Sequence, residues 1–172
     1  TFTAFFFADR LGITVEAVAG IVASLSLGGI LAVTIGAIGG GFLSDRLRRR
    51  RLFVCIGGIV MAIGMLLQAF APDVTLLIIG SLTTSLGIGL FAAVDQALLL
   101  DVLPERETDA GRFMGITGFA TSIPQSVAPL AASGILLIGV SGDARNYPLL
   151  FVIAAVLVIL GGAVIMRIRT VR

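Results

Sequence analysis

Long runs without a charged side chain alternate with short charged segments along the whole chain. Five of these runs have at least 21 residues each, and about 20 apolar residues at ~1.5 Å rise cross a hydrocarbon core of roughly 30 Å. A shorter apolar stretch, Thr1–Ala8, indicates the end of a helix truncated by the start of the chain. The pattern predicts an all-α, polytopic membrane helix bundle with five complete transmembrane helices plus a truncated one. The complete helices are expected near 17–43, 52–71, 74–101, 111–140 and 147–168.

Composition supports a membrane protein and argues against an enzyme. The chain is 58% hydrophobic and 13% charged, whereas soluble domains have about 25% charged residues. It contains no histidine, which removes most zinc sites and most Ser/His or Cys/His catalysis. The one cysteine, Cys55, lies in a predicted span and is read as a small core hydrophobe. We therefore expect no catalytic centre, no metal site and no cofactor.

Arginine residues divide unevenly between the two sides of the predicted bundle. If the spans alternate, segments 45–51, 101–112 and 167–172 share one side and carry ten arginines. The opposite side has only Arg10 and Arg145. Cytoplasmic loops carry the excess of basic residues, so the arginine-rich side and the C-terminus are predicted to be cytoplasmic, in a bacterial inner membrane. This distribution follows the membrane and argues against a nucleic-acid partner.

Small residues form a stripe along the first complete span, where they recur every four positions. This spacing lets two helix backbones approach closely in lipid, and it predicts tight helix packing. The stripe consists of Gly28, Ala32, Gly36 and Gly40.

Polar residues in the third and fourth spans predict the walls of a polar pathway. In the fourth span they step by four, and Pro124 and Pro129 deprive the carbonyls of Ala120 and Gln125 of their helical donors. Broken helices at membrane depth are tolerated where they line a wet cavity. The alternative is interhelical hydrogen bonding without any solute. The candidate pathway or coupling residues are Asp95, Gln96, Ser81, Thr84, Thr121 and Gln125.

Asp95 is an acid in an otherwise uncharged stretch of the third span. It follows Val74 by 21 residues, or roughly 32 Å along a helix, which places it near the cytoplasmic interface. An ionisable residue inside a span indicates function by default. Two hypotheses stay open: a proton or cation site, or an interfacial acid paired with an arginine.

The segment from Gly41 to Arg50, GFLSDRLRRR, resembles the loop motif of the major facilitator superfamily, Gly-x-Leu-Ala-Asp-Arg-x-Gly-Arg-Arg/Lys. That motif joins the second and third helices of a six-helix half, and the remaining layout of the chain fits as well. Arg48 departs from the motif, because the family usually has glycine there, and this puts the tight turn in doubt.

The resemblance implies a conformational latch at the cytoplasmic side. Arg49 would pair with an acid at the end of the fourth helix of the half, here Asp101, when the transporter faces outward. A carboxylate at the position of Asp45 can accept N–H groups from the positive N-terminus of a neighbouring helix. The alternative is that the cluster is only a topogenic signal. The implied motif residues are Gly41, Asp45, Arg46, Arg49, Arg50 and Asp101.

The resemblance implies that residues 1–172 are the C-terminal half of a twelve-helix transporter, from the end of helix seven to helix twelve. The alternative is that they are the N-terminal half. The partners would be a small solute, the bilayer and the missing six-helix half. The implied function is secondary active transport by alternating access, coupled to protons or cations. The segment 95–116 looks like that of sugar–cation symporters. A drug or organic-solute proton antiporter and a non-transporting membrane scaffold are the alternatives.

Overall fold

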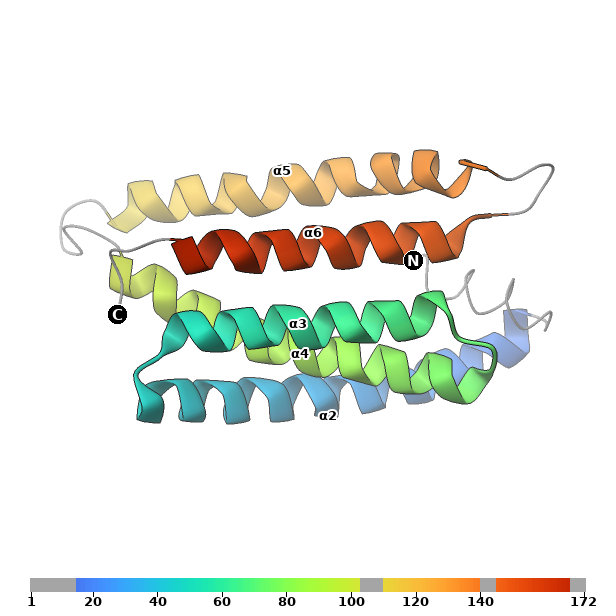
Figure 1. Cartoon of the computed structure of the whole chain (residues 1–172), viewed down its shortest axis with the longest axis horizontal. Helices are drawn as coiled ribbons and strands as arrows, with labels where there is room; N and C mark the ends of the chain where they lie inside the picture. The colour runs from blue at the N-terminus through green and yellow to red at the C-terminus, as the bar shows by residue number, and fades with distance from the viewer. Residues whose placement is uncertain (1–14, 103–109, 140–144, 168–172) are drawn as a thin grey trace.

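Five helices make up the computed structural model, which describes residues 15–102, 110–139 and 145–167 of the chain. They lie side by side along one direction (Figure 1). No strand occurs in these ranges, so the predicted all-α class is confirmed, with helix boundaries within a few residues of those expected. The expected stub at Thr1–Ala8 lies outside the described residues. The helices are α2 (Val15–Leu47), α3 (Arg50–Ala69), α4 (Val74–Val102), α5 (Ala110–Leu136) and α6 (Tyr147–Arg167).

Four of the five helices contain a segment long and apolar enough to span a membrane. These segments are Val22–Leu47, Arg50–Ala69, Val74–Gln96 and Tyr147–Met166. Helix α5 has 27 residues, about 40 Å at ~1.5 Å per residue, but it is richer in hydroxyl, amide and proline side chains. Its length suits a crossing, and its membrane span stays a prediction.

The outer face of α3 shows why such a helix is stable in lipid. Its exposed large apolar side chains recur at alternating spacings of four and three residues, which places them on one face of the helix. A face of this kind would be costly in water and is favourable against acyl chains. The residues are Leu52, Ile56, Ile59, Ile63 and Leu66.

Helix α4 is held between α2 and α3 by close backbone contacts at glycines. A Cβ atom placed on Gly87 would lie 2.5 Å from the backbone nitrogen of Met61 on α3. On the other side, a Cβ atom at Gly40 of α2 would lie 2.9 Å from the Leu90 side chain of α4. A Cβ atom at Gly36 of α2 would collide with the carbonyl oxygen of Leu86. The small-residue stripe therefore packs against α4, and the predicted close packing is confirmed.

Helix α5 continues without interruption through both prolines, so the expectation of a broken helix was wrong. Proline removes one backbone donor but does not force a break where local adjustments satisfy the backbone. Hydroxyl groups of this helix also bond its own carbonyls. Thr121 Oγ1 donates to the carbonyl of Gly118 at 2.9 Å, and Ser126 Oγ donates to the carbonyl of Ser122 at 2.9 Å.

The two ends of the bundle each have a small buried apolar cluster. At one end Ala71, Leu77, Leu136 and Tyr147 join the α3–α4 turn to the ends of α5 and α6. At the other end Phe53 and Val54 of α3 pack against Val94 of α4. The second cluster lies beside the arginine-rich turn and fixes how α3 and α4 meet there.

Candidate functional site

The turn between α2 and α3 consists of only two residues, Arg48 and Arg49. Arg48 has a φ of +50° and is the one described residue other than glycine with a positive φ. This is the position where the family motif has glycine, so the turn stays tight although an arginine occupies it. A left-handed conformation costs an L-residue about 1–2 kcal/mol. The backbone carbonyl of Arg49 accepts N–H groups of Leu52 (3.1 Å) and Phe53 (3.4 Å), which starts α3 without a side-chain cap.

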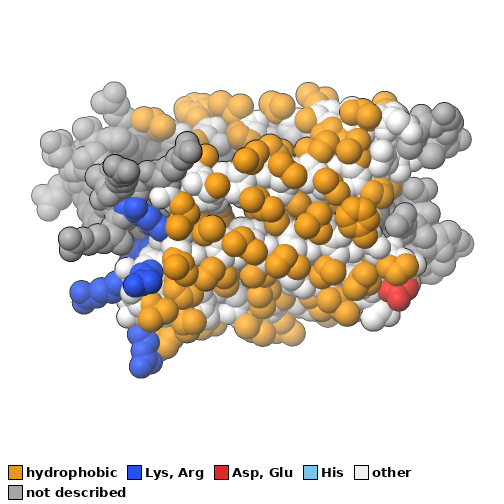
Figure 2. Space-filling view, viewed as in Figure 1, with side chains coloured by type: hydrophobic (Ala, Val, Ile, Leu, Met, Phe, Trp, Pro, Cys, Tyr) orange, Lys and Arg blue, Asp and Glu red, His pale blue; other side chains and the backbone are white. Residues whose placement is uncertain are grey.

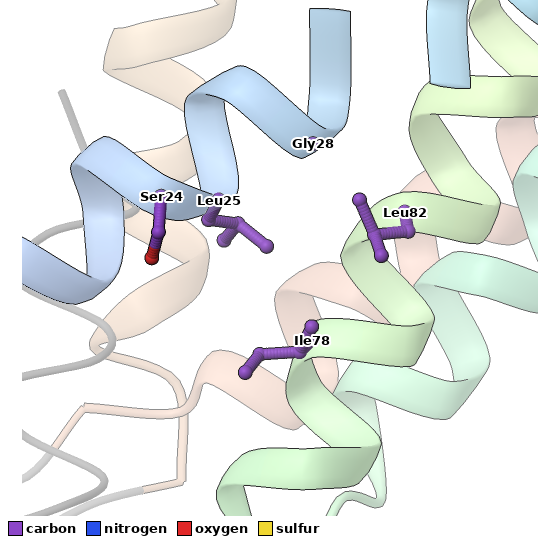
Figure 3. A pocket seen from close by; sticks show the side chains of 5 residues that line it. All are labelled: Ser24, Leu25, Gly28, Ile78 and Leu82. Atoms are coloured by element: carbon purple, nitrogen blue, oxygen red, sulfur yellow. The ribbon is translucent and has the colours of Figure 1, made fainter. Parts of the chain in front are cut away.

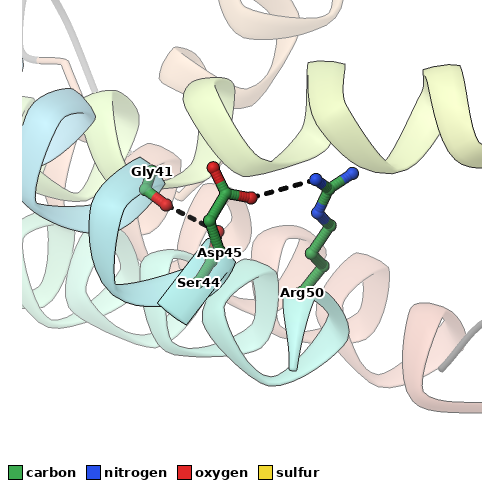
Figure 4. Close-up of polar contacts among 4 residues, drawn as sticks. All are labelled: Gly41, Ser44, Asp45 and Arg50. Carbon is green, nitrogen blue, oxygen red and sulfur yellow. Dashed lines mark hydrogen bonds and ion pairs between the residues drawn. The ribbon is translucent and has the colours of Figure 1, made fainter. Parts of the chain in front are cut away.

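Asp45 forms an ion pair across this turn, as Figure 4 shows. Arg50 Nη2 donates to Asp45 Oδ1 at 2.9 Å, and the two side chains are 25% and 63% exposed, respectively. Beside them Ser44 is buried, and its Oγ donates to the carbonyl of Gly41 at 3.1 Å. An exposed pair of this kind contributes about 0–1 kcal/mol. A contact of Asp45 with a neighbouring helix N-terminus is not among the contacts of the described residues, so the latch role stays a prediction.

The end of α4 lies at the same end of the bundle as the α2–α3 turn (Figure 1). Asp101 is in the last turn of α4, but its side chain is outside the described residues. The pairing of Arg49 with Asp101 therefore stays a prediction. Arg46 and Arg49 are exposed. Figure 2 shows the described basic side chains gathered at this end of the bundle, with an acidic side chain at the opposite end.

Thr84 lies in the contact between α4 and α3 and belongs to a buried polar cluster. Its Oγ1 accepts a hydrogen bond from Gln68 Nε2 at 2.9 Å and donates to the carbonyl of Gly80 at 2.9 Å. Gln68 is 6% exposed and also donates to the carbonyl of Gly64 at 3.3 Å. In this conformation Thr84 connects two helices of the bundle. The sequence reasoning missed Gln68, although a single amide in an apolar span was a usable signal.

Asp95 is half-buried near the basic end of α4. Within the described part of the chain its carboxylate has neither a hydrogen-bond donor nor an ion-pair partner. The preceding residue, Val94, is fully buried against Phe53 and Val54 of α3. Gln96 is exposed, and Ser81 is half-buried. A carboxylate in this position can take up and release a proton or hold a cation.

The polar residues of α5 are not brought together with those of α4. Thr121 and Gln125 are exposed, and the contacts of α5 are mainly with α6. No hydrogen bond joins either residue to Ser81 or Thr84 in the described ranges. A pathway lined by both α4 and α5 would therefore need a further element to enclose it.

A cavity of about 200 Å³ lies between α2 and α4 (Figure 3). Its lining is almost entirely apolar, and none of the predicted pathway residues faces it. Ligand pockets usually combine ~300–1,000 Å³ with a few convergent polar groups, which this cavity lacks. The described residues also contain no group of three or more His, Cys, Asp or Glu side chains that could hold a metal. The cavity is lined by Ser24, Leu25, Gly28, Ile78 and Leu82.

Comparison with known proteins relates the chain to one transporter family and to individual members of the same kind. The sequence profile of the Major Facilitator Superfamily matches residues 1–172. The galactose-proton symporter of Escherichia coli (strain K12) is 32% identical over 101 residues, which are 59% of this chain and 21% of the relative. The arabinose-proton symporter of Bacillus subtilis (strain 168) is 31% identical over 84 residues, 49% of this chain and 17% of the relative. The matched part is thus about a fifth of each relative's length, and no solved structure matches the chain significantly.

Proposed function

The chain belongs to the major facilitator superfamily, and from this premise we propose that the full-length protein is a secondary active transporter that moves a sugar-like solute together with protons. Residues 1–172 are its C-terminal half in this proposal, and the arginine-rich end faces the cytoplasm. The names of the two bacterial relatives, both sugar–proton symporters, support the solute class. The alternating access of the family supplies the transport cycle.

Asp95 is the observation that carries the coupling part of this proposal. It is an ionisable side chain within the span Val74–Gln96, and it has no partner within the described part of the chain. An apolar environment favours the protonated form of a carboxyl group, and a nearby guanidinium favours the ionised form. A carboxylate that alternates between two such environments takes up a proton on one side of the membrane and releases it on the other.

A drug or organic-solute proton antiporter is the second candidate, and one observation favours it. Sugar sites use aromatic rings as stacking platforms, but this half has no tryptophan and a single tyrosine. That residue, Tyr147, is 4% exposed within an apolar cluster. Under the sugar proposal the aromatic platform comes from phenylalanine or from the missing half.

The test is a counterflow screen of the full-length protein in liposomes. Galactose, arabinose, organic acids and a cationic dye are each loaded inside the vesicles, and entry of the labelled compound is followed. The proposal predicts counterflow of a sugar and, under an inward proton gradient, its accumulation. Counterflow of the dye alone would favour the antiporter, which exchanges dye for protons, over the sugar–proton symporter. Protein-free liposomes and liposomes with an unrelated membrane protein are the controls.

A further inference from the structure

Arg51, like Asp95, is a partly buried charged residue at the basic end of the bundle that has no partner among the described residues. Its Nε and Nη2 atoms are buried and have no hydrogen-bond acceptor within the described part of the chain. A buried donor left unsatisfied costs about 1–3 kcal/mol, and more when it is charged. Arg51 is not one of the arginines of the loop motif, because it follows the motif's last basic position.

Arg51 and Asp95 lie at the same level of the bundle. Val94, which precedes Asp95, packs against Phe53 and Val54, the second and third residues after Arg51. This contact joins the first turns of α3 to the part of α4 that carries Asp95.

The two side chains also point toward the same corner. Arg51 precedes Gly58 by seven residues, close to two helical turns, so it shares a face of α3 with Gly58. A Cβ atom on Gly58 would contact Val158 of α6 at 3.6 Å, so this face of α3 is turned toward α6. Asp95 follows Leu77 by 18 residues, which is five turns, and Leu77 belongs to one buried cluster with Tyr147 of α6. Both charges therefore face the corner between α3, α4 and α6.

The other charges described near this corner are already accounted for. Arg50 pairs with Asp45, and Arg46, Arg48 and Arg49 are exposed. The side chains of Asp101 and Arg167 are outside the described residues. Arg51, with two buried nitrogens that have no acceptor, and Asp95, with a half-buried carboxylate that has no donor, thus remain at one level of the bundle in the described part of the chain. A charge-assisted hydrogen bond between them would satisfy both groups.

We propose that Arg51 is the counter-charge of Asp95, and that the two form an ion pair in a second conformation in which the corner between α3, α4 and α6 closes. The coupling role of this pair rests on the proposed function, whereas the pairing itself does not. When the guanidinium of Arg51 approaches, it stabilises the ionised form of Asp95, and the carboxyl group gives up its proton to water. In this structure the two side chains are not paired, and an unpaired carboxylate is free to bind a proton again.

A double-mutant cycle on the full-length protein in liposomes tests the pair. Arg51→Gln is expected to slow solute exchange about tenfold, within the range of coupling for residues in one network. Arg51→Lys, which keeps the charge, should retain most of the activity. The double variant Arg51→Gln/Asp95→Asn should be no slower than the slower single variant, because the neutral pair leaves no unpaired charge. Arg48→Gln is the matched control and should stay within about twofold of the parent protein, since Arg48 is exposed. Additive effects of the two substitutions, or equal losses for Arg51→Gln and Arg48→Gln, would overturn the proposal.

Cysteine cross-linking tests the same pair without any transport assay. In a Cys55→Ser background, the pair Arg51→Cys/Asp95→Cys is treated with a short bismaleimide, and linked peptides are identified by mass spectrometry. A higher yield than for Arg48→Cys/Asp95→Cys supports the pair, and equal or lower yield contradicts it. Cross-linking without transport of any tested solute would sink the proposed function and leave the pair standing. Transport of a tested solute, with no cross-link and with additive effects of the two substitutions, would overturn the pair and leave the proposed function standing.

Discussion

Replacing Arg48 with glycine should stabilise the protein, because Arg48 has a φ of +50° in a two-residue turn. The left-handed conformation costs an L-residue about 1–2 kcal/mol, and glycine does not have this cost. Glycine gains freedom in the unfolded chain, which takes back about 0.5–1 kcal/mol. With the midpoints of these two ranges the expected net gain is about 0.75 kcal/mol, plus a few tenths from less repulsion among neighbouring arginines.

Arg48→Ala is the matched control, because alanine removes the same charge and keeps the left-handed cost. The full-length variants are heated in detergent, and the remaining monodisperse protein is measured by size-exclusion chromatography. Glycine should raise the apparent melting temperature by about 1–3 °C, and alanine should change it by less than about 1 °C. Equal values for the two variants, or a lower value for glycine, would show that the turn is not strained at this position.

Three further predictions concern packing, the buried polar cluster and sidedness. Gly87→Val should prevent the close approach of α3 and α4, since a Cβ atom there would lie 2.5 Å from the backbone nitrogen of Met61. The yield of membrane-inserted protein should fall severalfold. Gly39→Val is the control and should express normally, because nothing lies within 4 Å of a Cβ atom at Gly39. Gln68→Leu should lower stability by about 1–3 kcal/mol, measured by thermal unfolding in detergent, and wild-type stability would refute a structural role of this amide. A cysteine in place of Arg48 should react with an impermeant maleimide only after cells are permeabilised, and labelling of intact cells would invert the proposed topology.

The helical architecture could be predicted from the uncharged runs, because each run is long enough to span a bilayer and ends at charged residues. The end of one helix differs from the prediction because charged residues were taken to mark a loop. Helix α2 continues to Leu47, four residues beyond the expected end at 43, because Asp45 and Arg46 extend its last turn. Helix α5 ends at Leu136, before Gly139, which has a positive φ of 73°.

The candidate site was harder to predict, because periodicity tells which residues share a face but not which neighbour that face meets. Thr84 was expected in a pathway wall, yet its hydroxyl bonds Gln68 on α3. The prolines were expected to break α5, but the helix continues through them. Arg51 looked like one more arginine in a basic run, and only the packing of α3 shows that its Nε and Nη2 atoms are buried, whereas Arg48 and Arg49 are exposed.

Proton-driven uptake by Asp95→Asn tests the central claim most directly. The full-length protein is placed in liposomes with an inward proton gradient, and uptake is followed for the solute that gives counterflow. The substitution keeps the size of the side chain and removes its charge and its proton-binding capacity. Asp73→Asn is the matched control, because Asp73 lies at the opposite end, where its Oδ1 accepts the N–H of Leu76 at 2.8 Å.

The account predicts that Asp95→Asn abolishes accumulation against a gradient while exchange of solute across the membrane stays measurable, and that Asp73→Asn accumulates solute as the parent does. Unimpaired proton-driven accumulation by Asp95→Asn would contradict it and assign the coupling to the other half of the transporter.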